Sequence, residues 1–206
     1  MKVLLINGSP RREGNTYTAL REAANQLEKN GIETELMWLG NKPVYGCMAC
    51  MQCKARGNNR CVMDDDITNA VIGKMEHSDA IILGSPVYYG QPAGQLLCMQ
   101  QRMLYAGTPV FWGKPAAVVT VCRRGGATAA FQTLQMPFQM CSMPLVGSQY
   151  WNIAYGREAG QSAQDTEGMQ TMRTLADNMT YMLRQFATGT AEKPEQEAPQ
   201  PMHFIR

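Results

Sequence analysis

The chain has 206 residues, a formal net charge of +2 and seven cysteines. That length fits one domain with a sizeable core, and the near-neutral charge argues against nucleic acid or an anionic membrane surface as a partner. No stretch is apolar for long enough to span a bilayer, and the short apolar N-terminus runs into a polar loop rather than a signal-peptide cleavage site. We therefore expect a cytoplasmic protein.

The first predicted strand covers residues 3–6 and the first helix covers residues 17–27, with a polar loop at residues 8–16 between them. A helix N-terminus after such a strand offers unpaired N–H groups and a positive dipole end. Hydroxyl, amide and guanidinium groups suited to a phosphate monoester lie in the same loop: Ser9, Arg11, Arg12, Asn15 and Thr16. The loop matches neither a P-loop nor a Rossmann turn, and the alternative is a loop that only caps the helix.

Strand and helix signals alternate along the rest of the chain. The further predicted strands cover residues 32–39, 80–84, 115–121 and 144–151, and the further helices cover residues 64–78, 93–105, 128–140 and 165–184. Five such βα units predict a parallel sheet with helices on both faces. A ligand then binds beyond the carboxyl ends of the strands, where the loops 9–16, 86–90 and 123–127 are expected to meet.

The second and third of these loops suit a flat redox ring. Tyr88 and Tyr89 offer ring faces next to exposed backbone, and Gly125 and Gly126 allow close backbone approach. Positive charge beside a flavin stabilises its reduced anion, and Arg123 supplies such charge. A phosphate site next to a site for a flat redox ring indicates FMN. The alternative for the tyrosines is packing against a neighbouring helix or a partner subunit.

Four cysteines lie within one short segment, at Cys47, Cys50, Cys53 and Cys61. A reducing compartment disfavours disulfides and favours metal or redox use. Four thiolates can surround a 4Fe–4S cluster or a zinc ion, and the remaining alternative is a loop that holds nothing or oxidises. The other cysteines, Cys98, Cys122 and Cys141, are predicted to be small buried hydrophobes.

Acidic residues 64–66 open the second predicted helix, where they suit the helix dipole better than a magnesium site. No arrangement of nucleophile, base and orienting group is visible in the sequence. Residues 189–206 form a polar tail rich in glutamate and proline, and its apolar end at residues 203–205 can dock on the body or on a neighbouring subunit.

Three motifs carry a resemblance to a known family: Gly8-Ser9-Pro10-Arg11 with Gly14-Asn15-Thr16, then residues 84–90, then Gly125-Gly126. In this order they resemble the NAD(P)H-dependent FMN reductases of flavodoxin-like fold, over about residues 1–185. The cysteine segment is similar to that of the iron–sulfur flavoproteins. The resemblance implies an α/β three-layer sandwich at residues 1–188, with a five-stranded parallel sheet of order 2-1-3-4-5 and a cysteine-rich insertion at residues 43–63.

The resemblance also implies roles for individual residues. The expected phosphate ligands are Ser9, Arg11, Asn15 and Thr16; the residues expected beside the flavin ring are Pro86, Val87, Tyr88, Tyr89, Gly90, Gly125 and Gly126; and the expected cluster ligands are Cys47, Cys50, Cys53 and Cys61. The family further implies a homodimer or a dimer of dimers, with each cluster near a neighbouring subunit's flavin.

Two positions depart from the family pattern. Arg123 and Arg124 open the third loop, where relatives more often carry small or polar residues. Gln101 precedes Arg102 where many relatives carry an acid, which predicts that a local ion pair is missing.

The predicted function is that of an FMN-dependent oxidoreductase. Electrons pass from NAD(P)H through FMN, and through an iron–sulfur cluster where one is bound, to a small-molecule or protein acceptor. The flavin carries the chemistry, so no side chain is expected to be catalytic. The alternatives are a non-catalytic flavodoxin-like electron carrier and a sensor based on redox changes of the cysteine loop.

Overall fold

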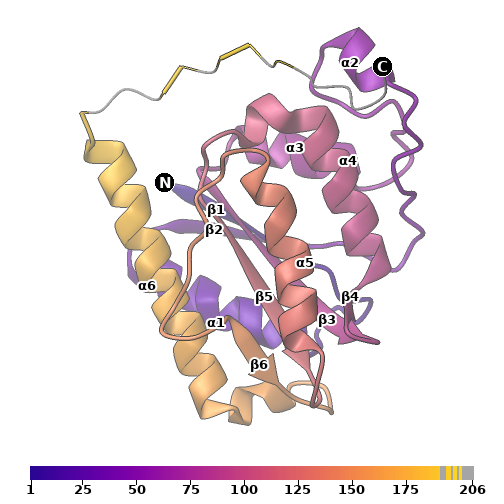
Figure 1. The fold of residues 1–206 in the computed structure, drawn as a ribbon. Coiled ribbons are helices and arrows are strands. Elements are labelled where there is room, and N and C mark those ends of the chain that lie inside the picture. Colours follow the sequence, from indigo (N-terminus) through magenta and orange to yellow (C-terminus); the bar gives the residue numbers. More distant parts are fainter. Residues whose placement is uncertain (191–193, 196, 199, 201–206) are drawn as a thin grey trace.

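A parallel sheet runs through the centre of the protein, with helices on both faces (Figure 1). The computed structural model describes residues 1–190, 194, 195, 197, 198 and 200. The predicted docking of residues 203–205 therefore lies outside the described residues.

The sheet has the strand order β2-β1-β3-β5-β6, and each neighbouring pair along this path is parallel. Counted without the short β4, which pairs antiparallel with β3 alone, this is the predicted order 2-1-3-4-5. The strands are β1 (Lys2–Asn7), β2 (Glu33–Trp38), β3 (Ala80–Tyr88), β4 (Gln91–Pro92), β5 (Ala116–Cys122) and β6 (Ile153–Tyr155). The predicted fold class is thus confirmed.

Two layers of helices cover the two faces of the sheet. The helices are α1 (Asn15–Lys29), α2 (Gln52–Arg56), α3 (Thr68–Glu76), α4 (Gly94–Phe111), α5 (Ala127–Gln139), η1 (Gln161–Gln164, a 3-10 turn) and α6 (Thr166–Thr188). Alternate residues of β1 point to opposite faces: Leu4 and Ile6 pack with α3, α4 and α5, whereas Val3 and Leu5 pack with α1 and α6. Burial on both faces explains why the central strands are continuous apolar runs.

The second ligand loop is partly a strand, which corrects the prediction that residues 86–90 are a loop. β3 continues to Tyr88, because Ser85 and Pro86 still pair with β5 and the next two residues pair with β4. Tyr89 and Gly90 connect β3 to β4 with positive φ values of 50° and 76°. Two successive positive φ values match the twist of a tight hairpin.

The prediction of a last strand at residues 144–151 is wrong. In that segment only Leu145 bridges to Ala116 on β5, and regular pairing resumes at β6. Asn152 interrupts the ladder, since its side-chain amide donates to the Val118 carbonyl at 3.0 Å. A side chain thus replaces the backbone donor at this point of the edge strand.

Helix α4 is longer than the predicted helix at residues 93–105. It continues to Phe111 across a kink at Gly107, where φ is −100° and ψ is 18°. Pro109 accounts for the kink, because its nitrogen cannot donate to the carbonyl four residues earlier. The helix after residues 64–66 also begins later than predicted, at Thr68, whose N–H donates to the Asp66 side chain.

Among the described helices, none combines the length and the apolar character that crossing a bilayer requires.

Candidate functional site

The three predicted ligand loops lie together at the carboxyl edge of the sheet. The Gly8 N–H donates to the Gly84 carbonyl at 2.8 Å, which joins the first loop to β3. The second and third loops touch at Gly90 and Gly126, where a Cβ on Gly126 would lie 2.8 Å from the Gly90 Cα. The fold therefore places the predicted phosphate loop and the two predicted ring loops next to one another.

The first loop is held closed by Asn7, a buried residue at the end of β1. Its side-chain oxygen accepts the Ser9 N–H at 3.1 Å, and its amide donates to the Arg12 carbonyl at 2.9 Å. The Ser9 hydroxyl oxygen accepts the Arg11 N–H at 3.1 Å. Asn7 was missed by the sequence analysis, because an asparagine ending an apolar strand carries no signal of which backbone groups it will bind.

The first turn of helix α1 has backbone N–H groups without acceptors among the described residues. Its N-cap is Gly14, which offers no side-chain cap, and no acidic residue stands in the first turn. Within the described part of the chain the backbone N–H groups of residues 15–17 meet no acceptor. Such a helix end attracts an anion through its N–H groups and its dipole. Helix α6 differs, since the Asp165 carboxylate accepts the Gly168 N–H there.

Asn15 lies at this helix end but is partly engaged elsewhere. Its side-chain oxygen accepts the Ser162 N–H at 3.0 Å, and its carbonyl accepts the Ser162 hydroxyl at 3.2 Å. The amide nitrogen remains available to a ligand. Thr16, the next predicted phosphate ligand, is buried, whereas Arg11 is exposed. The link to Ser162 was not predicted, because it joins residues 147 positions apart in the chain.

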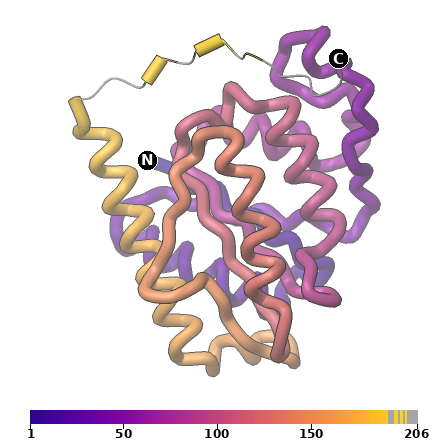
Figure 2. Tube along the Cα trace, in the orientation of Figure 1, coloured from indigo at the N-terminus to yellow at the C-terminus, as the bar shows by residue number. Residues whose placement is uncertain are grey.

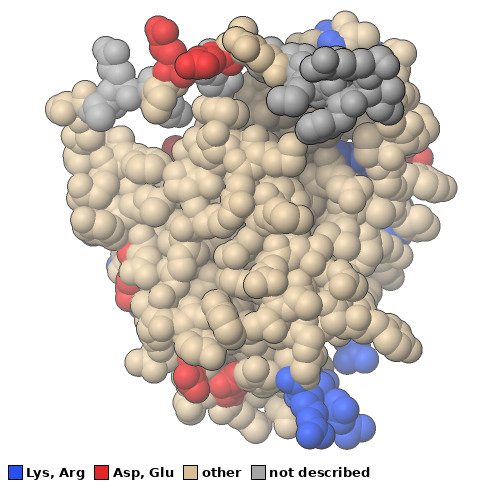
Figure 3. All heavy atoms as spheres, in the orientation of Figure 1, with Lys and Arg blue, Asp and Glu red and all other residues tan. Residues whose placement is uncertain are grey.

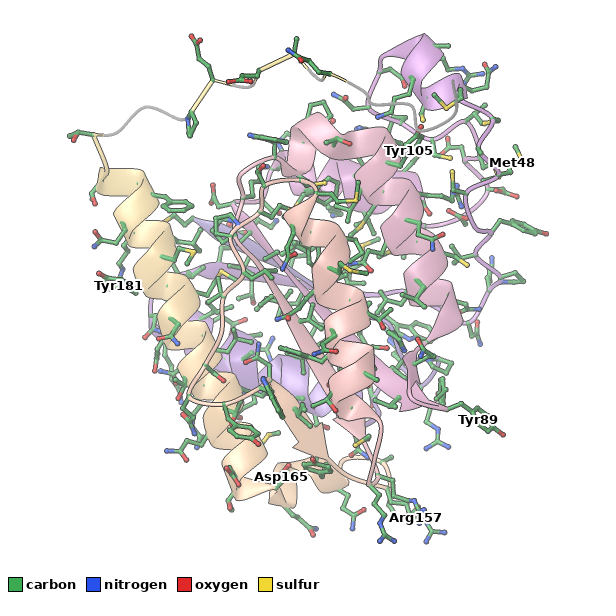
Figure 4. All side chains as sticks on the ribbon, viewed as in Figure 1. Met48, Tyr89, Tyr105, Arg157, Asp165 and Tyr181 are labelled. Atoms are coloured by element: carbon green, nitrogen blue, oxygen red, sulfur yellow. The ribbon has the colours of Figure 1, made fainter. Side chains whose placement is uncertain are left out.

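In the second loop Pro86 and Val87 are half-buried and both tyrosines are exposed. Tyr89 points away from the body of the protein, beyond the end of the hairpin (Figure 4). Tyr88 is 47% exposed, whereas Tyr89 is fully exposed. Both rings are free to contact a ligand.

The third loop is open and basic. Arg123, Arg124 and Gly125 are exposed, and Gly126 adopts a φ of 88°. Basic side chains gather at the end of the molecule where Arg157 also lies (Figures 3 and 4). Burial raises the pKa of the Cys122 thiol, although backbone N–H groups of Arg124 and Ala127 point at its sulfur. Cys122 is therefore a protonated thiol at neutral pH.

The four clustered cysteines line one cavity of about 20 Å³ together with Arg102 and Tyr105: Cys47, Cys50, Cys53 and Cys61. All four are free thiols. In the described part of the chain, however, no three ligating side chains come close enough to hold a metal ion. Ala49, Met51 and Asn59 have positive φ values of 53°, 58° and 57°. Left-handed backbone at non-glycine residues is costly and concentrates at functional loops.

Arg102 joins this cavity to the helical layer, and its ion-pair partner is present. The guanidinium is buried and pairs with Asp66, which precedes α3. The acid that many relatives carry next to this arginine is replaced by Gln101, and Asp66 supplies an ion pair from a distant part of the chain. Burial alone would raise the pKa of Asp66, but hydrogen bonds from Thr68 and Arg102 outweigh it and hold that pKa below its usual range.

Arg102 also holds both ends of the cysteine segment. It donates to the Tyr45 carbonyl at 3.2 Å, to the Met63 carbonyl at 2.7 Å and to the Cys61 sulfur at 3.3 Å. Outside this segment Cys141 and Cys122 are buried as predicted, whereas Cys98 is only half-buried.

The cysteine cavity and the ring loops lie at opposite ends of α4. Tyr105 lies eleven residues beyond the start of this helix, roughly 16 Å along its axis. Figure 4 shows Met48 and Tyr105 at one end of the molecule and Tyr89 and Arg157 at the other. The tube view shows the cysteine segment running along α4 toward that far end (Figure 2). Within one chain the two candidate sites are therefore separate.

Comparisons with known proteins agree with this geometry. A family model described as NADPH-dependent FMN reductase matches residues 1–158. An iron-sulfur flavoprotein of Methanocaldococcus jannaschii is 36% identical over 192 residues, covering 89% of this chain and 98% of the relative.

Solved structures show the same fold at low sequence identity. RosB with bound 8-demethyl-8-formylriboflavin-5'-phosphate aligns with a TM-score of 0.69 at 14% identity, over 100% of this chain and 94% of RosB. A flavodoxin from the domain Archaea aligns with a TM-score of 0.59 at 13% identity, over 89% of this chain and 99% of the flavodoxin.

Proposed function

The chain belongs to the NADPH-dependent FMN reductase family, and from that premise we propose that it passes electrons from NAD(P)H through FMN to a small-molecule or protein acceptor. The observation that carries the proposal is the uncapped start of α1, where three backbone N–H groups without acceptors lie beside the joined ring loops. Phosphate is the anion that such a helix end binds in many proteins.

The residues at this edge fit FMN. We assign the phosphate to Ser9, Arg11, Asn15 and Thr16, because these residues surround the open end of α1. When bound, FMN accepts a hydride from the nicotinamide and releases electrons singly or in pairs. Arg123 and Arg124 place positive charge on the third loop, which favours an anionic reduced ring beside it. The protein thus binds and orients the flavin and raises its potential.

The ring is assigned to the second and third loops: Pro86, Val87, Tyr88, Tyr89, Gly90, Gly125 and Gly126. The exposed tyrosine rings offer stacking surfaces. A Cβ on Gly125 would meet no atom within 4 Å, which leaves room for the edge of a ligand ring. No side chain is needed as an acid or base.

We further propose that Cys47, Cys50, Cys53 and Cys61 hold an iron–sulfur cluster. Four free thiols lining one cavity have the donor chemistry that such a cluster needs. The name of the relative from Methanocaldococcus jannaschii, an iron-sulfur flavoprotein, supports the same assignment. Closing the loop around a cluster would require the thiols to move closer together than they lie in the free chain.

A homodimer or dimer of dimers completes the proposal. The face over α5 and α4 carries almost no charged side chains (Figure 3), and Met136 and Met140 are exposed there. Depletion of charge is typical of the centre of an interface between subunits. Because the cysteine cavity is remote from the ring loops of its own chain, another subunit's flavin is its expected electron partner.

Protein purified without oxygen tests these assignments. We expect bound FMN, about four iron and four sulfide per chain, and steady-state oxidation of NADPH or NADH with an artificial acceptor. Bound flavin without iron would rule out the proposed cluster but leave the proposed reductase activity standing. Flavin without turnover of either nucleotide would favour the non-catalytic electron carrier.

A further inference from the structure

The phosphate loop contains one peptide group that cannot donate a hydrogen bond. This group joins Ser9 to Pro10, and proline has no N–H. It can present only the Ser9 carbonyl oxygen, which would repel an anion in the loop. A loop that binds phosphate through N–H groups therefore needs this carbonyl turned outward and given a donor of its own.

Trp38 supplies that donor from the neighbouring strand. It is the last residue of β2 and pairs in register with Asn7, the residue that closes the loop from the other side. The indole Nε1 donates to the Ser9 carbonyl at 2.8 Å. The carbonyl is thereby held toward β2, while the Ser9 side chain stays on the Arg11 side of the loop.

The same indole also contacts the far end of the loop. The guanidinium carbon of Arg12 lies 5.9 Å from the centre of the Trp38 ring, within reach of a cation–π contact. Since the Arg12 carbonyl is held by Asn7 at 2.9 Å, side chains at the ends of β1 and β2 fix the loop at both Ser9 and Arg12.

We propose that Trp38 is a positioning residue for the phosphate of FMN: its indole N–H holds the Ser9 carbonyl out of the anion site. This inference rests on the proposed function, because it assumes that the first loop binds the flavin phosphate. We expect the effect to be specific to the phosphate, since Trp38 ends the edge strand β2, which pairs with β1, whereas the ring loops follow β3 and β5.

The test compares two flavins that differ only in the phosphate. Dissociation constants of FMN and riboflavin are measured by flavin fluorescence on the full chain freed of flavin, for the unaltered protein and for Trp38→Phe. Losing one hydrogen bond is expected to weaken FMN binding about two- to tenfold, while the affinity for riboflavin stays the same. The ratio of the two affinities therefore falls.

Trp112→Phe is the matched control, because Trp112 is also half-buried but lies between the end of α4 and the start of β5, at the end of the strands away from the first loop. It should leave the ratio unchanged. Equal weakening of both flavins by Trp38→Phe would show a packing role and overturn the proposal, as would no weakening of FMN. If the unaltered chain bound riboflavin as tightly as FMN, or bound neither, the phosphate site of the proposed function would itself be refuted.

Discussion

At the scale of single residues, the unusual contacts are those that tie a loop to a distant element. Asn15 and Arg102 each bind backbone groups of a segment that the sequence does not place beside them. Buried polar groups need such partners, because an unpaired buried donor or charge costs several kcal/mol. These contacts therefore stabilise the loops on which the proposed site depends.

Breaking the ion pair between Asp66 and Arg102 should destabilise the protein strongly. Asp66→Asn leaves the buried guanidinium without its counter-charge, and such a change costs about 3 kcal/mol. Asp65→Asn, at the exposed neighbouring position, should cost almost nothing. Urea unfolding at pH 7 measures both, and equal midpoints for the two variants would contradict the expectation.

The same pair predicts a loss of stability in acid. The folded state lowers the pKa of Asp66, so its contribution is fully present above the ordinary pKa of an aspartate and is lost as the pH falls through the lower folded value. The difference in unfolding free energy between the unaltered protein and Asp66→Asn should therefore shrink below about pH 4. A difference that stays constant with pH would contradict this assignment.

Gly126 should be less replaceable than Gly125. Gly126→Ala places a Cβ at a φ of 88° and 2.8 Å from the Gly90 Cα, which strains the backbone and separates the second and third loops. Gly125→Ala meets no atom within 4 Å. Thermal unfolding should show a lower Tm for Gly126→Ala and an unchanged Tm for Gly125→Ala. The measurement uses flavin-free protein, so that a clash between a bound flavin and the methyl group added at position 125 does not contribute.

At the scale of elements, the two long helices beside the site end differently at their N-termini. Helix α1 has no side-chain cap, whereas Asp165 caps α6 and also accepts the Tyr155 N–H at 2.8 Å. At α6 the cap side chain accepts a helix N–H, whereas the first N–H groups of α1 are left for another acceptor.

Removing the cap of α6 should cost stability but not phosphate recognition. Asp165→Ala is expected to lower the unfolding free energy by about 1–2 kcal/mol, and to leave the ratio of FMN to riboflavin affinity unchanged. Glu167→Ala, in the same helical turn but without a capping contact, should have a small effect. Chemical unfolding and flavin titration of both variants provide the comparison.

At the scale of the whole molecule, charge and apolar surface are unevenly distributed. Basic residues gather at the end of the molecule where Arg157 lies, which is also the end of the proposed flavin site, and the face over α5 is nearly free of charge (Figures 3 and 4). The face proposed as a subunit interface is thus distinct from the basic end of the molecule, whose positive charge would attract an anionic nucleotide.

Charge introduced on the α5 face should weaken self-association. Met140 is 85% exposed at the end of α5, and Met140→Glu would bury a charge in the proposed interface. Sedimentation velocity should show a shift toward monomers. Tyr181→Glu, which adds the same charge at an exposed site on α6, is expected to leave the distribution unchanged, and equal shifts for both would place the interface elsewhere.

Local patterns in the sequence determined the fold class and the identity of the ligand loops. The apolar runs of β1, β3 and β5 indicate strands that are buried on both faces. The short polar loops that follow these strands indicate the edge of the sheet where ligands bind. These signals are local, because a strand or a helix start is encoded within a few successive residues. The order of the five parallel strands followed from that alternation and the family resemblance.

Only the tertiary structure decided the edge strand, the hairpin after β3 and the partners of the loops. Asn152 interrupts a ladder through a side-chain bond to β5, Arg102 finds its acid 36 residues away, and Trp38 reaches Ser9 from another strand. Each depends on which polar group lies within about 3 Å after the chain has packed. That proximity is a property of the assembled sheet and has no local trace in the sequence.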